Sequence, residues 1–343
     1  MLEAKDEYWH PAEPHSHWNE SFYFNAFDAK SGWACATRVG ATPNRNRRDG
    51  FLCLYLPDQT TGFIATSEQV SGSEPRVAAG KIEFFCVEPF RAWQIRYDGP
   101  IHHFPNVASS DDLRQTVDPV AETRSIRLEL DITPFHEPFD FDRRTIRLRP
   151  LGEMMRTAAR QPTAAVRRTL RTLGSLSAMV GAHHFEQSTR VRGTITLDGA
   201  IHVIDGFGQR DRSWGVRDMR APARWRWLSC QFGRALCFNA TQVDVLAMRV
   251  QGGFVLDGDS AEPIERWHFQ ARHGTSTYWP DDLDLTIATT SGRELEIHAD
   301  IVTPLPVVAA TEDGEALVTA ARAIYRWEDQ IATGMVEFME QLS

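Results

Sequence analysis

Apolar and polar residues alternate with a period of two along most of this chain, as in β-strands that bury one face. Clusters of Gly, Pro, Asp and Asn separate these runs at the spacing of hairpins. The expected strands of the first half are Ser21–Ala26, Trp33–Val39, Phe51–Leu56, Gly62–Glu68, Ile82–Glu88, Trp93–Tyr97, Ile126–Ile132 and Thr145–Leu148. Those of the second half are Trp225–Phe232, Leu236–Val243, Leu246–Val250, Gly253–Leu256, Ile264–Ala271, Asp284–Thr289, Leu295–Ile301, Ala320–Trp327 and Gly334–Met339.

The number of short strands decides the expected fold class. Roughly eight or nine antiparallel strands in each half favour two up-and-down barrels over one sandwich. The prediction is an all-β protein of two tandem antiparallel β-barrels with one helix between them. The expected domains are residues 1–182 and residues 183–343. The second domain is expected to carry a hairpin of Val191–Leu197 and Ala200–Ile204, turning at Asp198-Gly199.

One segment departs from the alternation. Thr163–Val180 has apolar residues at helical spacing and arginines on the opposite side. Pro162 suits the start of a helix and Gly181 suits its end. This predicts a basic amphipathic helix at the end of the first domain. The helix either packs against a barrel wall with its arginines in water or makes transient contact with a membrane surface.

The highest local density of charge lies in Gly206–Asp218, which reads GFGQRDRSWGVRD. Side chains alternate across a strand, so one face carries Asp211 and the other carries Arg210, Arg212 and Trp214. Charges inside a sheet must be paired or solvated, because an isolated buried charge is costly. Two interpretations follow. Either Asp211 forms buried ion pairs with Arg217 or Arg210 that only hold a barrel closed, or the charges line a functional site.

Composition excludes several classes of function. The 343 residues carry a net charge of -9, which argues against a nucleic-acid partner. The chain has no apolar run long enough to span a membrane, and its charged start has no signal core, so we expect a cytoplasmic protein. Five scattered cysteines form no metal or redox pair, and the histidines lack the spacing of a zinc site. We therefore expect no metal and no cofactor. Oligomeric state is left open.

The run GFGQRDRSWGVRD resembles the Gly-x-Gly-x-Arg-Asp-His-Ser-Trp-Gly-x-Arg-Asp signature of lipocalin-like bacterial proteins similar to carotenoid 1,2-hydratase (hydroxyneurosporene synthase) and AttH. HHFEQ followed by VRGTITLDG, and ESFYFNAFDAKSGWACATRVGATPN near the start, resemble other segments of that family. The resemblance implies two lipocalin-like (calycin) barrels. One position departs from the pattern: Arg212 stands where the family has His. An arginine can orient an anion but cannot serve as a general acid.

The resemblance implies acid–base chemistry on a hydrophobic, isoprenoid- or steroid-like molecule by a hydratase, isomerase or cyclase, in a barrel cavity lined by Trp and Phe. Such chemistry needs a carboxyl group within reach of the substrate. We expect Glu186 to transfer the proton, with His184, which shares its face of the strand, as the relay. Arginines are expected to keep the third catalytic candidate, Asp211, ionised, so that it serves with Trp214 as a base or orienting group. The expected substrate-binding residues are Trp214, Arg210, Arg212, Arg217, Asp218, Arg38 and Asn44.

A non-catalytic carrier of a lipophilic ligand is the alternative, because small barrels commonly hold one ligand. The arginines near Asp211 lower the pKa of a carboxylic acid and so favour this alternative. A purely structural role of the charged run, with the function elsewhere, is the third possibility. In the first two cases the partner is a hydrophobic small molecule.

Overall fold

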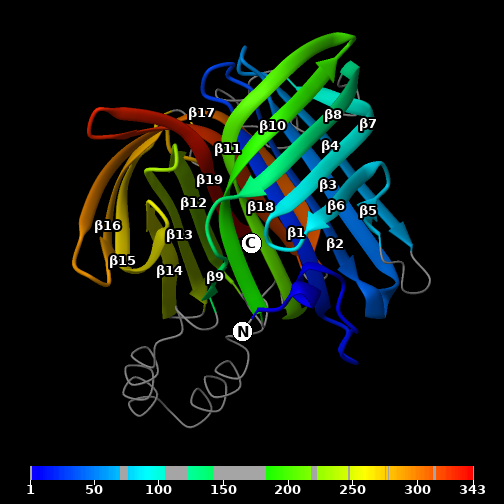
Figure 1. Cartoon of the computed structure of the whole chain (residues 1–343), viewed down its shortest axis with the longest axis horizontal. Coiled ribbons are helices and arrows are strands. Elements are labelled where there is room, and N and C mark those ends of the chain that lie inside the picture. Colours follow the sequence, from blue (N-terminus) through cyan, green and yellow to red (C-terminus); the bar gives the residue numbers. More distant parts are fainter. Residues whose placement is uncertain are drawn as a thin grey trace.

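Figure 1 shows a computed structural model of the chain as two β-structures side by side. The structure describes residues 2–69, 76–104, 122–141, 183–217, 222–245, 248–274, 276, 278–311 and 314–342. The helix expected at Thr163–Val180 and the strand expected at Thr145–Leu148 lie outside these residues. Among the described residues, no helix has the length and apolar character needed to cross a bilayer.

The first sheet has the order β4-β3-β2-β1-β11-β10-β8-β7-β6-β5, and β9 adds to β10. Strand β4 also pairs with β7, so β1 to β4, β7, β8, β10 and β11 form a closed circuit of antiparallel pairs. The strands are β1 (Trp18–Phe27), β2 (Ala34–Thr42), β3 (Arg47–Tyr55), β4 (Thr61–Gln69), β5 (Val77–Ala79), β6 (Ile82–Glu88), β7 (Ala92–Phe104), β8 (Glu122–Pro134), β9 (Phe139–Asp140), β10 (His183–Leu197) and β11 (Ala200–Val216). Two short 3-10 turns, η1 (Ala4–Glu7) and η2 (Pro43–Arg45), lie beside it.

The second structure is a closed barrel of eight antiparallel strands in sequence order. They are β12 (Arg224–Phe232), β13 (Leu236–Val245), β14 (Met248–Asp257), β15 (Ser260–Arg272), β16 (Asp282–Thr289), β17 (Glu294–Thr311), β18 (Gly314–Trp327) and β19 (Gln330–Leu342). The expected all-β class is confirmed. The strand expected at Gly253–Leu256 and the described residues of the one expected at Leu246–Val250 instead belong to one strand, β14, whose pattern is interrupted by two glycines.

The expected domain boundary at residue 182 assigns the hairpin of β10 and β11 to the wrong structural unit. The turn at Asp198-Gly199 is present, with both residues at positive φ, but β11 pairs with β1 and β10 pairs with β8. The hairpin therefore belongs to the first sheet, and the change of sheet falls between Val216 and Arg224. Alternation and turn residues identify a hairpin, but they do not identify which outer strands it will join.

The interiors of both barrels are filled with side chains. Phe22, Phe24 and Trp93 belong to the core of the first barrel, and Phe238 and Tyr325 to that of the second. An open surface hollow of about 620 Å³ next to Trp33 contains no residue of the charged run. The apolar cavity expected inside a barrel is therefore replaced, in the described residues, by packed aromatic cores.

The two barrels meet through an apolar cluster and several hydrogen bonds. Phe27, Tyr55, Leu305 and Met335 belong to this cluster, and Tyr55 Oη donates a hydrogen bond to Ala320 O at 3.2 Å. Figure 1 shows β10 and β11 in the centre of the molecule, and both contact β12 of the second barrel. One face of the charged hairpin strand β11 thus points into the first barrel, and the other points toward the second.

Gly208 in the charged run marks a close approach between β11 and β1. A Cβ atom at this position would overlap the backbone carbonyl of Asn25. We expect Gly208→Ala to lower the free energy of unfolding by about 1–3 kcal/mol, because the neighbouring strand would have to shift. Urea unfolding measures this, with Val203→Ala on the exposed part of β11 as control, where about 0.5 kcal/mol or less is expected. Equal effects of the two changes would argue against the close approach.

Candidate functional site

Three titratable side chains of the hairpin meet between the barrels. His184 and Glu186 are two residues apart on β10 and share a face, and Glu186 lies opposite Asp211 of β11 in the strand register. His184 Nε2 is 2.6 Å from Asp211 Oδ2 and 3.2 Å from Glu186 Oε1. We call these three residues the junction cluster. The structure thus brings together the three residues that the sequence analysis named as catalytic candidates.

The two carboxyl groups of the junction cluster differ in access. Glu186 is fully buried, and it accepts hydrogen bonds from Trp227 Nε1 at 3.2 Å and from Gln209 Nε2 at 2.8 Å, besides its contact with His184. The Asp211 side chain is 23% exposed, and its Oδ2 bonds to His184. Asp211 is therefore the carboxyl group that a small molecule can reach, while Glu186 stands behind His184.

Charges within the cluster shift the pKa values in opposite directions. Burial alone would lower the pKa of His184, but the Asp211 and Glu186 carboxylates outweigh it and raise that pKa to about 10. Burial raises the pKa of Glu186 against the opposing effect of His184. Burial also acts to raise the pKa of Asp211, but the cations His184, Arg217 and Arg38 lower it overall. At neutral pH the cluster therefore holds an imidazolium beside an ionised Asp211.

Aromatic rings surround this charge. The ring of Phe141 stacks on the His184 imidazole, with centroids 4.4 Å apart and planes 14° apart. Tyr23 of β1 meets the Trp227 ring edge-on across the junction, at 5.6 Å. Aromatic faces can stabilise a cation that forms beside them and keep water away from it.

The junction cluster also has the donor atoms of a metal site, which the sequence did not predict. The three potential ligand atoms lie within 4.8 Å of one another. A metal-binding histidine normally donates its second N–H to an acceptor, yet His184 Nδ1 is buried with no hydrogen-bond partner in the described residues. Glu186 also already accepts bonds from Trp227 and Gln209. The same Nδ1 carries a proton in an imidazolium, so its lack of a partner disfavours both states alike. The three side chains therefore offer the groups of an imidazolium–carboxylate cluster and the ligand atoms of a metal site.

The opposite face of β11 is closed by the N-terminal segment. Arg210 lies in the core of the first barrel and forms a bidentate pair with Glu7, at 2.8 Å and 2.5 Å. Its guanidinium also lies over the rings of Phe24, Trp93 and Phe185. The ion pair expected between Arg210 and Asp211 is therefore wrong, because alternation turns these neighbours to opposite faces.

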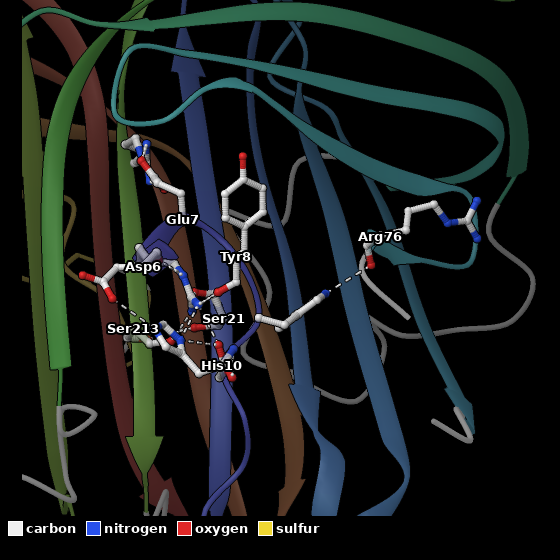
Figure 2. Close-up of polar contacts among 11 residues, drawn as sticks. Asp6, Glu7, Tyr8, His10, Ser21, Arg76 and Ser213 are labelled. Atoms are coloured by element: carbon white, nitrogen blue, oxygen red, sulfur yellow. Dashed lines mark hydrogen bonds and ion pairs between the residues drawn. The ribbon is translucent and has the colours of Figure 1, made fainter. Parts of the chain in front are cut away.

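Arg212 also has a structural environment. It donates hydrogen bonds to Glu20 Oε2 at 2.6 Å and to the carbonyl oxygens of Tyr8 and Asp6 at 2.7 Å and 3.1 Å. Figure 2 shows Asp6, Tyr8 and His10 of the N-terminal segment close to Ser21 of β1 and Ser213 of β11. His10 stacks on Trp214 with centroids 4.4 Å apart. Arg212 thus points away from the junction cluster.

The remaining expected binding residues are divided. Arg38 pairs with Asp49 at 2.5 Å and adds positive charge near Asp211, as does Arg217. Asn44 instead holds the N-terminal segment by donating to the carbonyl oxygens of Glu13 and His15. The expected residue Asp218 lies outside the described residues. Arg210, Arg212, Trp214 and Asn44 therefore do not line the junction, whereas Arg38 and Arg217 lie near it.

Sequence analysis missed the contribution of the second barrel. Trp227 bonds Glu186, and Gln231 Nε2 donates to Gln209 Oε1 at 3.3 Å. Trp225 Nε1 donates to Glu337 at 2.7 Å close to the same junction. The alternation of Trp225 and Trp227 shows that they share a face of β12, but it cannot show that this face meets another barrel.

The Glu7–Arg210 pair yields a stability test. Both residues are buried, with no more than 1% of their surface exposed. Glu7→Gln should lower the free energy of unfolding by about 3–5 kcal/mol, because it leaves the Arg210 charge without compensation. The exposed Glu13→Gln variant is the control in urea unfolding, with little change expected. A Glu7→Gln protein as stable as the control would argue against this pairing.

The raised pKa of His184 predicts a dependence of stability on pH. The folded protein binds the proton up to about pH 10, whereas an unfolded His releases it near its ordinary value of 6.5. The resulting stability is full below the unfolded value and is lost as pH rises toward 10. Between about pH 8 and 10, the wild type should lose about 1.4 kcal/mol per pH unit more than His184→Gln. Parallel slopes in urea unfolding would contradict the charged state of His184.

Comparisons with known proteins agree with this architecture. An AttH-type protein from Nitrosomonas europaea aligns at TM-score 0.60 and 12% identity, over 95% of this chain and 93% of its own. Kievitone hydratase from Nectria haematococca aligns at 0.57 and 9%, over 99% and 93%. CghA with Sch210972 aligns at 0.55 and 8%, over 96% and 89%. These likenesses show a shared fold. No protein with a curated description matches the sequence. The family model described as domain of unknown function DUF7064 matches residues 3–342, and the chain belongs to that family.

Proposed function

We propose that this protein is an acid–base enzyme that acts on a hydrophobic small molecule at the junction of its two barrels. The observation that carries the proposal is the junction cluster, in which a partly exposed Asp211 contacts a buried His184 backed by Glu186. Perturbed titratable groups concentrated between two structural units are typical of catalytic sites. The reaction classes that fit are hydration or dehydration, isomerisation and cyclisation.

The accessible carboxyl group decides the proposed roles. Asp211 would exchange a proton with the substrate, since its side chain is partly exposed whereas Glu186 is fully buried. Asp211 is ionised at neutral pH and is therefore suited to act as a base. His184 would orient Asp211, and Glu186 would keep His184 cationic. This exchanges the roles that the sequence suggested for Glu186 and Asp211.

The proposed substrate is hydrophobic because aromatic rings border the charged groups. Phe141 covers His184, and Tyr23 and Trp227 form the adjoining wall between the barrels. Such faces bind extended apolar molecules, and they stabilise a cation that forms when an alkene is protonated. An isoprenoid- or steroid-like skeleton is the finer proposal. The similarity of fold to a protein described as kievitone hydratase supports the reaction class.

A carrier function is the second candidate, but the packing of the molecule disfavours it. A lipocalin-type carrier holds its ligand inside a barrel. Here the described interiors contain Phe22, Trp93, Phe238 and Tyr325, all buried to 1% or less. A ligand would have to lie at the junction, next to the charges of the cluster. Those charges have a clear use in proton transfer and none in the binding of an apolar molecule.

A screen of candidate compounds in deuterated water tests the proposal across the reaction classes named above. Prenylated phenols, steroid enones, isoprenoid alkenes and hydrophobic β-hydroxy ketones are incubated with the protein. Mass spectrometry then detects gain or loss of water, or incorporation of deuterium. We expect Asp211→Asn and Glu186→Gln to reduce turnover by roughly 10²-fold or more, since each removes an ionisable group.

The control is Asp205→Asn on the same strand, where Asp205 is half exposed and pairs with the exposed Arg192. Turnover unchanged in both Asp211→Asn and Glu186→Gln would refute acid–base catalysis at the cluster. A lipophile that co-purifies in native mass spectrometry without any turnover would instead establish the carrier function. Turnover that is lost on chelation and restored by a divalent cation would assign the cluster to a metal.

A further inference from the structure

Strand β19 of the second barrel places a carboxyl group on the face that meets the first barrel. Met335 and Glu337 are two residues apart and therefore share a face. Met335 belongs to the apolar cluster between the barrels, together with Tyr55 and Phe27. Glu337 follows at the edge of this cluster and is only partly exposed. The acidic residue thus points toward the first barrel.

Two tryptophans of β12 connect Glu337 to the junction cluster. Trp227 lies opposite Glu337 in the strand register, and its Nε1 donates to Glu186 Oε1 at 3.2 Å. Trp225, on the same face of β12, donates its Nε1 hydrogen to Glu337 Oε1 at 2.7 Å. Adjacent indoles therefore bind one carboxyl group from each barrel, and both lie on the face of β12 that meets the first barrel.

The charges near Glu337 are those that surround Asp211. Arg217 interacts electrostatically with both carboxyl groups, and Asp211 and Glu337 repel each other. Burial, with the repulsion from Asp211, raises the pKa of Glu337 despite the opposing effects of Trp225 and Arg217. The pKa of Asp211 is shifted the other way. When the environments of two carboxyl groups shift their pKa values in opposite directions, one group can serve as the catalytic acid and the other as the catalytic base.

We propose that Glu337 is the second catalytic residue of the junction, the acid that works opposite the base Asp211. This inference rests on the proposed function and completes it. In the dehydration of a β-hydroxy ketone, Asp211 takes the proton from the carbon next to the carbonyl. The electrons of that C–H bond form the C=C bond as the C–O bond breaks, and the hydroxyl group leaves as water with the proton of Glu337. Hydration runs the same steps in reverse.

Glu337→Gln separates the two proton transfers. With a hydrophobic β-hydroxy ketone in deuterated water, we expect the variant to keep exchange at the acidic carbon to within about tenfold, while dehydration falls by roughly 10²-fold or more. Asp211→Asn should lose both. The matched control is Glu340→Gln, three residues along the strand, where Glu340 is about half exposed and pairs with Arg224. Dehydration by Glu337→Gln at the rate of this control would overturn the proposal.

A second measurement tests the shared space without any substrate. The indole ¹⁵N–H resonance of Trp225, assigned with Trp225→Phe, should follow the titration of Glu337 because the indole bonds that carboxyl group. Its midpoint should move to lower pH in Asp211→Asn, since removal of a nearby negative charge eases ionisation. An unmoved midpoint would place the two groups in separate environments and overturn the inference. A moved midpoint with no turnover of any screened compound would overturn the catalytic role and the proposed function together.

Discussion

The structure depends on the compensation of the charges that β11 buries on both of its faces. On the inner face, Arg210 and Arg212 enter the aromatic core of the first barrel and are paired with Glu7 and Glu20. On the outer face, Asp211 pairs with His184 between the barrels. Each of these charges would be prohibitively costly to bury alone. The strand is therefore stable only with its partners in place.

The inner pairs explain why the described part of the first barrel is filled at this end. Glu7 belongs to η1 and pairs with Arg210, and Arg212 donates hydrogen bonds to the backbone of Asp6 and Tyr8. The N-terminal segment therefore covers both arginines. A charged group that fills a barrel in this way leaves no room for an apolar ligand. The consequence is that the accessible chemistry lies on the outer face of the barrel wall.

The outer face becomes a site only because a second barrel covers it. Trp227 supplies a hydrogen bond that fixes Glu186, and Trp225 fixes Glu337 nearby. Contact between the two barrels thereby buries Glu186 on the first and Glu337 on the second, and this burial raises the pKa of both carboxyl groups. The first barrel alone, with the same hairpin, would expose Glu186 to water and leave it near its ordinary pKa. The tandem arrangement is thus the source of the perturbed chemistry.

The sequence by itself determined the all-β class, the hairpin turn at Asp198-Gly199, and the shared face of His184 and Glu186. These features depend on local rules, namely strand alternation and the conformations that turn residues prefer. It also identified Asp211 as a candidate catalytic residue. Only the tertiary structure decided that the hairpin joins β1 and β8, because register with distant strands leaves no mark on the local pattern.

The tertiary structure also decided which charges meet. The partners of Arg210 and Arg212 lie about 200 residues away in the sequence, at separations of 203 and 192. No spacing rule links residues so far apart. The relative access of Glu186 and Asp211, and the presence of Glu337, depend likewise on how one barrel covers the other. Local physics thus fixed the strands and their faces, while long-range packing assigned each charged face to a core or to the proposed site.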